Sequence, residues 1–515
     1  MYPTLLVPSE LVNELSSLSP PLHHSRALVK RLDLYGKLYG HKGCVNSVHF
    51  CPNGAILVSG SDDKDIIFWN WETKSKMLAY SSGHSDNVFE AQIMPYTEDR
   101  VVVTSAADGQ LAVPSIYTMG VQSFFKLLTD CHFQSAALNL LKLVWMFSIS
   151  PPLLHTSSYR GFWLQGIFPF TFPYQVRLGQ MREDGKVDTK LLGMHHGRIH
   201  KLAIEPGSPH NFYSCGEDGL VQHFDLRTET AVKLFTCFSF SDSKQPILLN
   251  TIVIDPRNPH YFSTGGFDEY ARVYDIRNYQ RDASNGFDQP VNTFCPLHLI
   301  GCSNVHITGL AYSRTSELLV SYNDELIYMF EKNMGVGPNP RTIQAEGFHN
   351  LDKPQVYEGH RNSETVKGVS FFGPCDEYVV SGSDCGHIYI WKKTGGELMR
   401  MMVGDKHIVN CMEPHPFFPF LATSGFDENV KLWAPAARKL HSIPKNAKQI
   451  MTANKRGREA RARITLSPDV IMHVLRLQRR QTLLYTEPLS ADADSDSDST
   501  PEDGSAASPR DCNIS

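Results

Sequence analysis

The feature that most constrains the fold of this chain is a sequence unit that recurs along most of its length. Each unit has an alternating apolar and polar run, a turn built on Ser, Gly and Asp, and a second run that ends in an aromatic residue. Clear copies run from Gly40 to Trp71, from Gly359 to Trp391 and from Met412 to Trp433. Alternation is typical of strands, and recurrence indicates a repeat architecture, so we expect a series of similar β-sheets.

Seven turn aspartates give the register of the repeat, and five of the six intervals between them are 43 to 60 residues long. A four-stranded propeller blade needs about 40–45 residues plus loops, and propellers have roughly 4–8 blades. We therefore predict an all-β, seven-bladed propeller over residues 39–434, with Leu34 to Tyr39 as a strand that closes the ring beside the last blade. The aspartates are Asp62, Asp108, Asp218, Asp268, Asp324, Asp384 and Asp427.

The interval between Asp108 and Asp218 is 110 residues and breaks the period. It contains Leu111 to Gln175, an apolar stretch of 65 residues whose single acidic residue is Asp130. Without this stretch the interval shortens to 45 and the text reads SAADGQVRLGQM, which is a blade turn followed by a strand. The pattern therefore predicts an atypical insert in the second blade.

Three hypotheses account for the insert. The preferred one is a retained intron, because FPFTFPYQ can be encoded by a pyrimidine-rich tract that ends in CAG. The second is a functional insertion loop. The third is a membrane span over Ala136 to Leu154, which has a suitable length. Lys142, the pair Pro151-Pro152 and the position inside a blade argue against the span, so no membrane partner is expected.

The histidines and aspartates of the repeat are interpreted as structural rather than catalytic. The repeats resemble WD-repeat blades, although the Trp-Asp pair itself never occurs in this sequence. The resemblance implies buried hydrogen-bond networks made by a His, a Ser, an Asp and a Trp, which make a blade rigid when every polar group is satisfied. One expected network comprises His41, Ser59, Asp63 and Trp69, and the other comprises His360, Ser381, Asp384 and Trp391.

The sequence offers no pattern for an enzyme, a metal site or a cofactor. GxSxG, HExxH and Walker motifs are absent from it, and its eleven cysteines include no CxxC pair. His195, His196 and His200 form a loose cluster near a blade opening, which we interpret as structural. Scattered cysteines favour reduced thiols in an intracellular protein of the cytoplasm, the nucleus or both. The first residues lack a basic start and a long apolar core, so a secretory signal is not expected.

The two ends of the chain differ from the propeller in composition. Residues 1–38 are predicted to be a helical or extended lead-in, with helical signals at Ser9 to Leu18 and Ser25 to Leu34. Residues 435–489 form a basic helical extension, with a helix predicted after Pro468. Its part 445–480 carries ten Lys and Arg and either touches nucleic acid or lies as a solvated helix on the propeller. Residues 490–515 are acidic and Ser-rich, which predicts disorder, with Ser495 and Ser497 as candidate phosphorylation sites.

In two consecutive blades a strand ends in the pattern aromatic-Asp-x-Arg. The full boxes, FYSCGEDGLVQHFDLR and FSTGGFDEYARVYDIR, are sixteen residues each and end at Arg227 and Arg277. In one interpretation Asp225 and Asp275 cap tight turns and both arginines are solvated. In the other the arginines bind a partner, because a planar guanidinium makes oriented, bidentate contacts.

The paired boxes resemble the docking boxes of WD-repeat substrate receptors of cullin-4 RING ubiquitin ligases, the cullin-4-associated factor family. Segments such as GHKGCVNSVHF and LSPDVIMHVLRLQRRQTL extend the resemblance over roughly Tyr39 to Leu484, except for the insert. It implies that Asp225, Arg227, Asp275 and Arg277 bind the damaged-DNA-binding adaptor subunit. The opposite face and the channel mouth then receive an unidentified protein substrate. The alternative is a non-enzymatic scaffold propeller of a chromatin- or RNA-associated assembly.

Overall fold

The computed structural model describes residues 23–108, 174–242, 244–280, 290–302, 304–342 and 352–463. Several predictions lie outside these residues and are not tested by the structure. They are the helical signal at Ser9 to Leu18, nearly all of the insert, the helix after Pro468 and the acidic tail.

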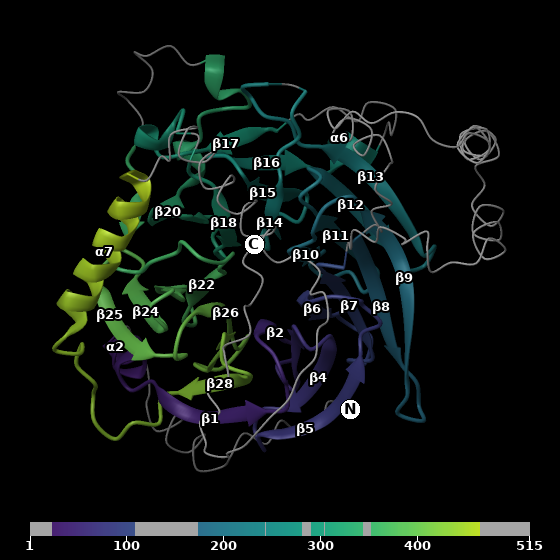
Figure 1. The fold of residues 1–515 in the computed structure, drawn as a ribbon, viewed down its shortest axis with the longest axis horizontal. Coiled ribbons are helices and arrows are strands. Elements are labelled where there is room, and N and C mark those ends of the chain that lie inside the picture. The colour runs from purple at the N-terminus through teal and green to yellow at the C-terminus, as the bar shows by residue number, and fades with distance from the viewer. Residues whose placement is uncertain are drawn as a thin grey trace, which may run out of the picture.

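The described residues form seven four-stranded antiparallel sheets arranged as blades around a central axis (Figure 1). This confirms the predicted seven-bladed propeller. Blade 1 comprises β2 (Val45–Phe50), β3 (Leu57–Ser61), β4 (Asp65–Asn70) and β5 (Ser75–Ser81). Blade 2 comprises β6 (Val88–Ile93), β7 (Val101–Ala106), β8 (Tyr174–Met181) and β9 (Val187–His195). Blade 3 comprises β10 (Lys201–Ile204), β11 (Asn211–Cys215), β12 (Leu220–Asp225) and β13 (Thr230–Thr236).

The remaining blades follow in chain order, and the first strand of each lies nearest the axis (Figure 1). Blade 4 comprises β14 (Leu249–Ile254), β15 (Tyr261–Gly266), β16 (Ala271–Asp275) and β17 (Asn292–Phe294). Blade 5 comprises β18 (Ile307–Tyr312), β19 (Leu318–Tyr322), β20 (Ile327–Phe330) and β21 (Gln355–Tyr357). Blade 6 comprises β22 (Val369–Phe372), β23 (Tyr378–Ser381), β24 (His387–Lys392) and β25 (Leu398–Val403).

Blade 7 closes the ring with strands from both ends of the propeller. It comprises β26 (Val409–Pro414), β27 (Leu421–Gly425), β28 (Asn429–Ala434) and, as its outer strand, β1 (Asp33–Tyr39). β1 pairs antiparallel with β28, with Leu34 opposite Trp433 and Tyr39 opposite Asn429. The predicted closing strand is confirmed, and the propeller begins at Asp33 rather than at residue 39.

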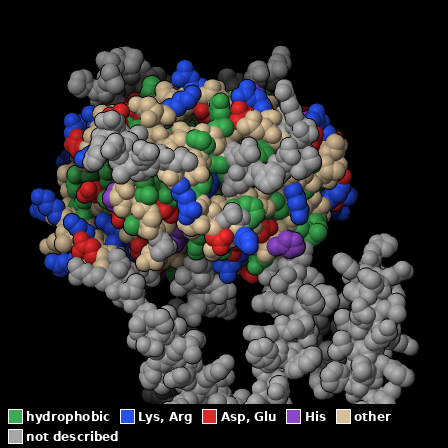
Figure 2. Space-filling view, turned by 90° about the horizontal axis from the view of Figure 1, so that it is seen from above, with side chains coloured by type: hydrophobic (Ala, Val, Ile, Leu, Met, Phe, Trp, Pro, Cys, Tyr) green, Lys and Arg blue, Asp and Glu red, His purple; other side chains and the backbone are tan. Residues whose placement is uncertain are grey.

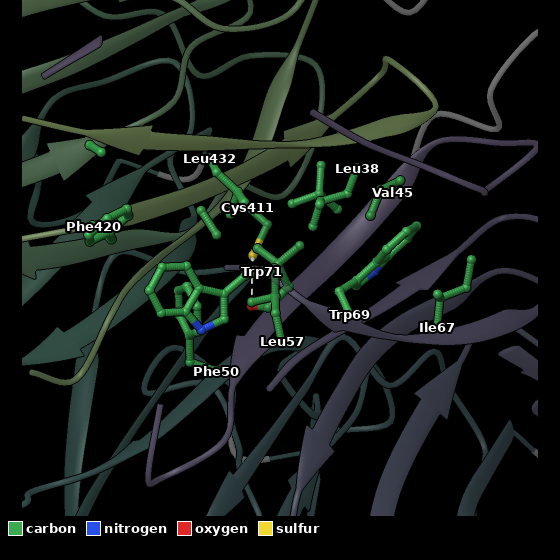
Figure 3. Packing of buried hydrophobic residues seen from close by; sticks show 14 residues of the cluster. Leu38, Val45, Phe50, Leu57, Ile67, Trp69, Trp71, Cys411, Phe420 and Leu432 are labelled. Atoms are coloured by element: carbon green, nitrogen blue, oxygen red, sulfur yellow. Dashed lines mark hydrogen bonds between the residues drawn. The ribbon is translucent and has the colours of Figure 1, made fainter. Parts of the chain in front are cut away.

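The core lies between neighbouring sheets, because the central strands are buried on both of their faces. All five residues of β3 and all five of β27 are buried. Figure 3 shows one such layer, in which Trp71 and Leu57 of blade 1 pack with Phe420 of blade 7 and Leu38 of β1. Burial of a large apolar side chain stabilises the fold by about 1.5–3 kcal/mol, so this layer holds the closure in place.

The insert interrupts the sequence of blade 2 without interrupting its sheet. β7 and β8 pair in continuous register from Val101 opposite Gln180 to Ser105 opposite Val176. The backbone N–H of Gln175 donates to the Asp108 carboxylate at 3.0 Å. β8 begins at Tyr174, so Gln175 belongs to the blade rather than to the insert as we had assigned it.

Helices are few among the described residues and lie outside the sheets. α2 (His23–Lys30) contacts β25, and α7 (Ala447–Arg463) buries Ala447 against blades 5 and 6. Short helices are α6 (Arg277–Gln280), η1 (Leu297–Leu299), η2 (Lys332–Met334) and η3 (Pro340–Thr342). The helix predicted over Ser25 to Leu34 ends at Lys30, because the chain then extends into β1. Within the described ranges, no helix is long and apolar enough to cross a bilayer.

Candidate docking face

The two Asp-x-Arg boxes occupy equivalent positions in blades 3 and 4. Asp225 is the last residue of β12 and pairs with Asn211, and Asp275 is the last residue of β16 and pairs with Tyr261. The following residue of each box donates its N–H to a histidine carbonyl, from Leu226 to His210 at 3.0 Å and from Ile276 to His260 at 2.9 Å. The two turns therefore have the same backbone construction.

Each aspartate holds the arginine of its own box in a bidentate contact. Arg227 donates from Nε to Asp225 Oδ1 at 3.0 Å and from Nη2 to Oδ2 at 2.7 Å. Arg277 repeats the contact with Asp275 at 2.9 and 2.5 Å. In both boxes the backbone N–H of the arginine also donates to the aspartate carboxylate, at 2.9 Å in the first box and 3.0 Å in the second. The aspartates therefore cap the turn and orient the guanidinium, and whether the arginines bind a partner stays a prediction.

The electrostatics of the boxes point to orientation rather than to stability. The arginine side-chain hydrogen bond lowers the pKa of Asp225 to about 2 and also lowers the pKa of Asp275. The Arg227 and Arg277 side chains are nevertheless 64% and 55% exposed. Because ion pairs in water contribute only about 0–1 kcal/mol to stability, the pairs do little for folding. They hold two solvated cationic forks in fixed directions.

Both arginines lie on one face of the propeller, which we call the arginine face. Each stands where the third strand of its blade ends, and blades 3 and 4 are neighbours. In an antiparallel blade, the loop after the third strand lies at the same edge as the loop after the first. The opposite face carries the turn aspartates and the connections between blades, and we call it the aspartate-turn face.

The surroundings of the two arginines differ. Arg277 begins α6, whose Tyr279 is buried against Phe235 and Tyr274. Its guanidinium lies 6.0 Å from the Tyr261 ring centroid. Arg227 is instead followed by Thr228, whose hydroxyl bonds to the carbonyl of Asp225 at 3.2 Å. Arg277 therefore has the more extensive local support.

The structure brings His41, Ser59, Asp63 and Trp69 together in blade 1. His41 contacts Asp63 through Nδ1 at 3.0 Å and Ser59 through Nε2 at 2.7 Å. The Trp69 indole donates to the same Ser59 hydroxyl at 2.8 Å. Burial alone would raise the pKa of Asp63, but the hydrogen bond and charge of His41 outweigh it and the pKa is lowered.

Blades 2 and 3 hold networks that sequence reasoning missed. His84 contacts Asp108 at 2.8 Å and Thr104 at 2.9 Å. His195 contacts Asp218 at 3.0 Å and Ser214 at 2.7 Å. Neither network contains a Trp: Phe224 stands in blade 3 where blade 1 has Trp69. The signals in the sequence that could have revealed these networks are the pair Gly83-His84 before blade 2 and the pair His195-His196 before blade 3.

The rest of the histidine cluster is divided between two environments. His200 Nε2 lies 2.9 Å from Glu217 Oε1, and the His200 ring stacks on the Phe89 ring with the centroids 4.8 Å apart. His196 is exposed, and its backbone N–H donates to Asp218 at 2.8 Å. The structure therefore separates the cluster into blade contacts and does not gather it into one site.

The network expected in blade 6 does not form, although its four residues lie in one blade. Both ring nitrogens of His360 lack hydrogen-bond partners among the described residues, and the Trp391 indole donates to the Glu358 carbonyl at 2.9 Å. Asp384 pairs with the buried Lys367. The acid of blade 1 lies four residues after its serine, and the equivalent position after Ser381 is Cys385. The expectation for Asp384 was therefore wrong.

The described residues present no group that resembles a metal centre. They contain no cluster of three or more His, Cys, Asp or Glu side chains suited to an ion. Every cysteine that the structure describes is a free thiol.

Comparison with known proteins defines the class. The family WD domain, G-beta repeat matches residues 32–70, 352–392 and 396–434. These ranges fall in blades 1, 5, 6 and 7 and in the closing strand. The described residues are thus a seven-bladed β-propeller, and three of its segments match the WD domain, G-beta repeat.

Among particular proteins, the chain is similar to Protein ALTERED SEED GERMINATION 2 of Arabidopsis thaliana, with 28% identity over 60% of this chain and 37% of that protein. It is similar to DDB1- and CUL4-associated factor 6 of Homo sapiens, with 26% identity over 62% of this chain and 30% of that protein. It is also similar to WD and tetratricopeptide repeats protein 1 of Mus musculus, with 24% identity over 80% and 86%. The chain spans only about a third of the length of the first two relatives.

Proposed function

We propose that this protein is the substrate-recognition subunit of a cullin-4 RING ubiquitin ligase. The observation that carries the proposal is the pair of equivalent Asp–Arg forks on adjacent blades, with both guanidinium groups fixed and exposed. Similarity to DDB1- and CUL4-associated factor 6 supports it. Within the family, the sequence segments quoted above most resemble the eighth member, and that assignment is part of the proposal.

The two forks bind the damaged-DNA-binding adaptor subunit in this proposal. Each aspartate occupies the Nε and Nη2 edge of its arginine, so the other guanidinium edge is left for a carboxylate or carbonyl of the adaptor. Fixing the side chain in advance reduces the ordering cost of binding. Arginine at the centre of an interface contributes strongly to affinity, whereas lysine cannot reproduce the planar fork.

The protein itself supplies no catalytic chemistry in this scheme. It holds a protein substrate on the aspartate-turn face and thereby raises the effective concentration of the substrate near the ubiquitin-loaded partner. The same proposal places the protein in the cytoplasm, the nucleus or both.

A scaffold in a chromatin- or RNA-associated assembly is the second candidate. The observation that favours it is α7, which buries Ala447 and Asn454 and exposes Lys448, Lys455 and Arg456. In the view of Figure 2, however, acidic and basic side chains are interspersed over the described surface. Affinity of α7 for nucleic acid that falls steeply with salt would favour this candidate.

Co-precipitation with the adaptor tests the proposal. The full chain is expected to bind, and the double variant Arg227→Ala, Arg277→Ala is expected to lose at least 90% of the bound adaptor. Arg182→Ala is the matched control, because Arg182 is an exposed arginine that pairs with Asp188 after the third strand of blade 2. Adaptor binding that survives in the double variant, at an unchanged melting temperature, would exclude the proposed role of the boxes.

A further inference from the structure

The inner loops of the arginine face divide it into two halves of different chemistry. In every blade the loop between the first and second strands opens on this face, at the edge where the Asp-x-Arg boxes lie. The first strands β26, β2 and β6 stand side by side around the axis, and β10, β14 and β18 continue the ring (Figure 1). Blades 7, 1 and 2 therefore supply one half of the face, and blades 3, 4 and 5 supply the other.

Apolar side chains are exposed in the inner loops of blades 7, 1 and 2. Tyr96 of blade 2 is 79% exposed, and Phe417 of blade 7 is 67% exposed. Pro52 is exposed in the loop of blade 1, which lies between these two blades. We call Tyr96, Phe417 and Pro52 the aromatic rim. Exposed apolar side chains that gather on one face of a soluble protein commonly mark a binding surface.

The loop of blade 2 holds Tyr96 outward at a cost to its backbone. Tyr96 has a φ of 58°, in the left-handed region, and Glu98 and Asp99 follow with φ of 54° and 57°. Tyrosine seldom adopts this conformation, because its Cβ then crowds the following carbonyl oxygen. The Thr97 hydroxyl closes the loop by donating to the Met94 carbonyl at 2.7 Å. Strained backbone of this kind is concentrated at functional sites.

The buried ring of His415 fixes the loop that carries Phe417. His415 Nδ1 accepts the backbone N–H of Phe417 at 3.1 Å and that of Phe418 at 3.0 Å. On its other side, Nε2 donates to the Gly54 carbonyl of the blade 1 loop at 3.0 Å. Burial lowers the pKa of His415 to about 4, so the neutral ring supplies one donor and one acceptor. The Phe417 loop is therefore ordered before any partner binds.

The aromatic rim is continuous with the first Asp-x-Arg box. Asn53 Nδ2 donates to Asp99 Oδ2 at 3.2 Å, which ties the loop of blade 1 to the loop of blade 2. Met94 of the blade 2 loop and Leu226 of the box belong to one hydrophobic cluster. The loops of blades 7, 1 and 2 thus form a platform that shares its underlying core with the adjoining box in blade 3.

Blades 3, 4 and 5 present four exposed arginines on the same face, and we call them the basic rim: Arg227, Arg257, Arg277 and Arg314. The Arg314 side chain is 62% exposed and donates to the Pro374 carbonyl at 2.9 Å. The carboxylates that pair with these arginines lie mostly below the surface, with at most 18% of the side chain exposed: Asp225, Asp275 and Asp376. The exposed Glu229 is engaged by Lys190 of blade 2. The basic rim therefore exposes guanidinium groups more than carboxylates.

We infer that the arginine face takes one protein partner across both halves, with an apolar region against the aromatic rim and a row of carboxylates against the basic rim. The partner is the cullin-4 adaptor subunit, and for that identity the inference rests on the proposed function. The inference adds to the two forks an apolar anchor on blades 7, 1 and 2 and two further arginines, Arg257 and Arg314.

Size and chemistry both favour a partner that spans the two halves. An interface of standard size takes about 20–30 residues from each side, so the two forks make up only a small part of one. Aromatic and arginine side chains are enriched in interfaces and contribute most of their affinity. The loops of Tyr96 and Phe417 are fixed in advance, which lowers the ordering cost of binding. Carboxylates on the partner complement the exposed guanidinium groups.

The affinity of the full chain for the purified adaptor tests the aromatic rim. The variant Tyr96→Asn, Phe417→Ser is expected to bind at least tenfold more weakly, and asparagine tolerates the left-handed backbone, so the loop keeps its shape. Tyr39→Asn, Val403→Ser is the matched control, because both of these side chains are 69% exposed and lie on the aspartate-turn face. The control is expected to bind like the wild type. Wild-type affinity in the aromatic variant would overturn the inference.

The salt dependence of the same affinity tests the basic rim. Arg257→Ala, Arg314→Ala is expected to weaken binding at low salt and to make the affinity less sensitive to added salt, because salt screens exposed charges. The aromatic variant is expected to keep the salt dependence of the wild type. An unchanged salt dependence in the arginine variant would contradict contact with the basic rim. Equal melting temperatures of all proteins show that weaker binding does not come from unfolding.

The outcomes separate this inference from the proposed function. If the wild type binds the adaptor and only the variant Arg227→Ala, Arg277→Ala is defective, the inference fails and the proposed function stands. If the wild type does not bind the adaptor, both fail. Self-association of the wild type that the aromatic variant abolishes would assign the aromatic rim to a second copy of the chain and would also overturn the inference.

Discussion

Blades 1 and 6 have nearly the same turn sequence and are held together in different ways. In blade 1, His41, Ser59, Asp63 and Trp69 complete a buried network within the blade. In blade 6, Cys385 stands at the position of Asp63, and Asn454 of α7 reaches into the blade. Asn454 donates to the Gly359 carbonyl at 2.8 Å, to the Tyr389 hydroxyl at 3.1 Å and to Cys385 Sγ at 3.4 Å.

The difference shows that one repeat can be stabilised either by its own residues or by an element beyond the propeller. Blade 1 depends on contacts between residues about twenty positions apart. Blade 6 depends on a helix that lies after the last blade. A change in α7 should therefore affect blade 6 and leave blade 1 intact.

The largest expected effect comes from breaking the network of blade 1. His41→Ala leaves Asp63 and Ser59 without the His41 ring as hydrogen-bond partner and should cost about 3 kcal/mol of unfolding free energy. His360→Ala removes a buried ring whose nitrogens lack partners in the described structure, so its cost should be smaller, about 1–2 kcal/mol. Chemical denaturation of both variants measures the difference. Equal losses would remove the distinction between the two blades.

A deletion of residues 111–175 compares blade 2 with the uninterrupted blade 3. In blade 3 the backbone N–H of Leu220 donates to the carboxylate of Asp218, two residues earlier, at 3.1 Å. In the shortened chain we expect the backbone N–H of Gln110 to donate to Asp108 in the same way, in place of the N–H of Gln175. Each doubling of loop length costs about 0.6 kcal/mol, so the deletion should stabilise the protein by about 2 kcal/mol.

Thermal unfolding of the full and shortened chains measures this effect. A lower melting temperature after deletion would mean that the segment contributes to the fold and would contradict the retained-intron hypothesis. Transcripts that all contain the segment would contradict that hypothesis independently.

Asn454→Ala should destabilise blade 6 by about 1–2 kcal/mol, because it removes the hydrogen bonds to the buried Gly359 carbonyl and to the Tyr389 hydroxyl, which keeps only its contact with Cys385. Hydrogen exchange should accelerate at Tyr389 and Trp391 and remain unchanged at Trp69. Lys455→Ala, a change of the exposed neighbour on α7, is the control. Acceleration spread evenly over both blades would argue against local support by α7.

The smallest expected effect is a pH dependence from Cys385. Burial alone raises the pKa of a thiol, but hydrogen bonds from His387, Ser383, Asn454 and Tyr389 outweigh it and lower the pKa of Cys385 to about 6. The folded pKa is below the ordinary value, so the stabilisation is complete above that value and is lost as pH falls toward 6.

Comparison of the wild type with Cys385→Ser between pH 6 and 9 measures this term. The wild type should gain on the order of 1 kcal/mol relative to the variant as pH rises. A difference in stability that stays constant over this range would show that the thiol does not ionise in the folded protein.

Sequence patterns predicted the parts of the molecule that depend on local spacing. Turn aspartates at blade intervals predicted the seven blades, and the usual closure of propellers by an N-terminal strand predicted Leu34 to Tyr39 beside the last blade. The two Asp-x-Arg boxes lie at equivalent strand ends because the turn aspartate, the box aspartate and the arginine of the second box each follow those of the first by fifty residues. Whether their arginines bind an adaptor stays a prediction.

Contacts that depend on alignment between blades or on distant segments could not be predicted in this way. Blade 1 has two successive aspartates, Asp62 and Asp63, and only the second contacts histidine. Matching Asp384 to that role shifted blade 6 by one position. The support from Asn454 has no local signature, because its partners are 65 to 95 residues away.

The closing strand β1 also constrains the order of events on the ribosome. Its partner β28 is about 400 residues downstream, and synthesis at roughly 5–20 residues per second takes about 20–80 s to reach it. During that interval Asp33–Tyr39 has emerged while its pairing edge does not yet exist. Nascent propellers therefore expose an unpaired strand, and chaperone demand during translation should depend on the N-terminal strand as much as on the blade made last.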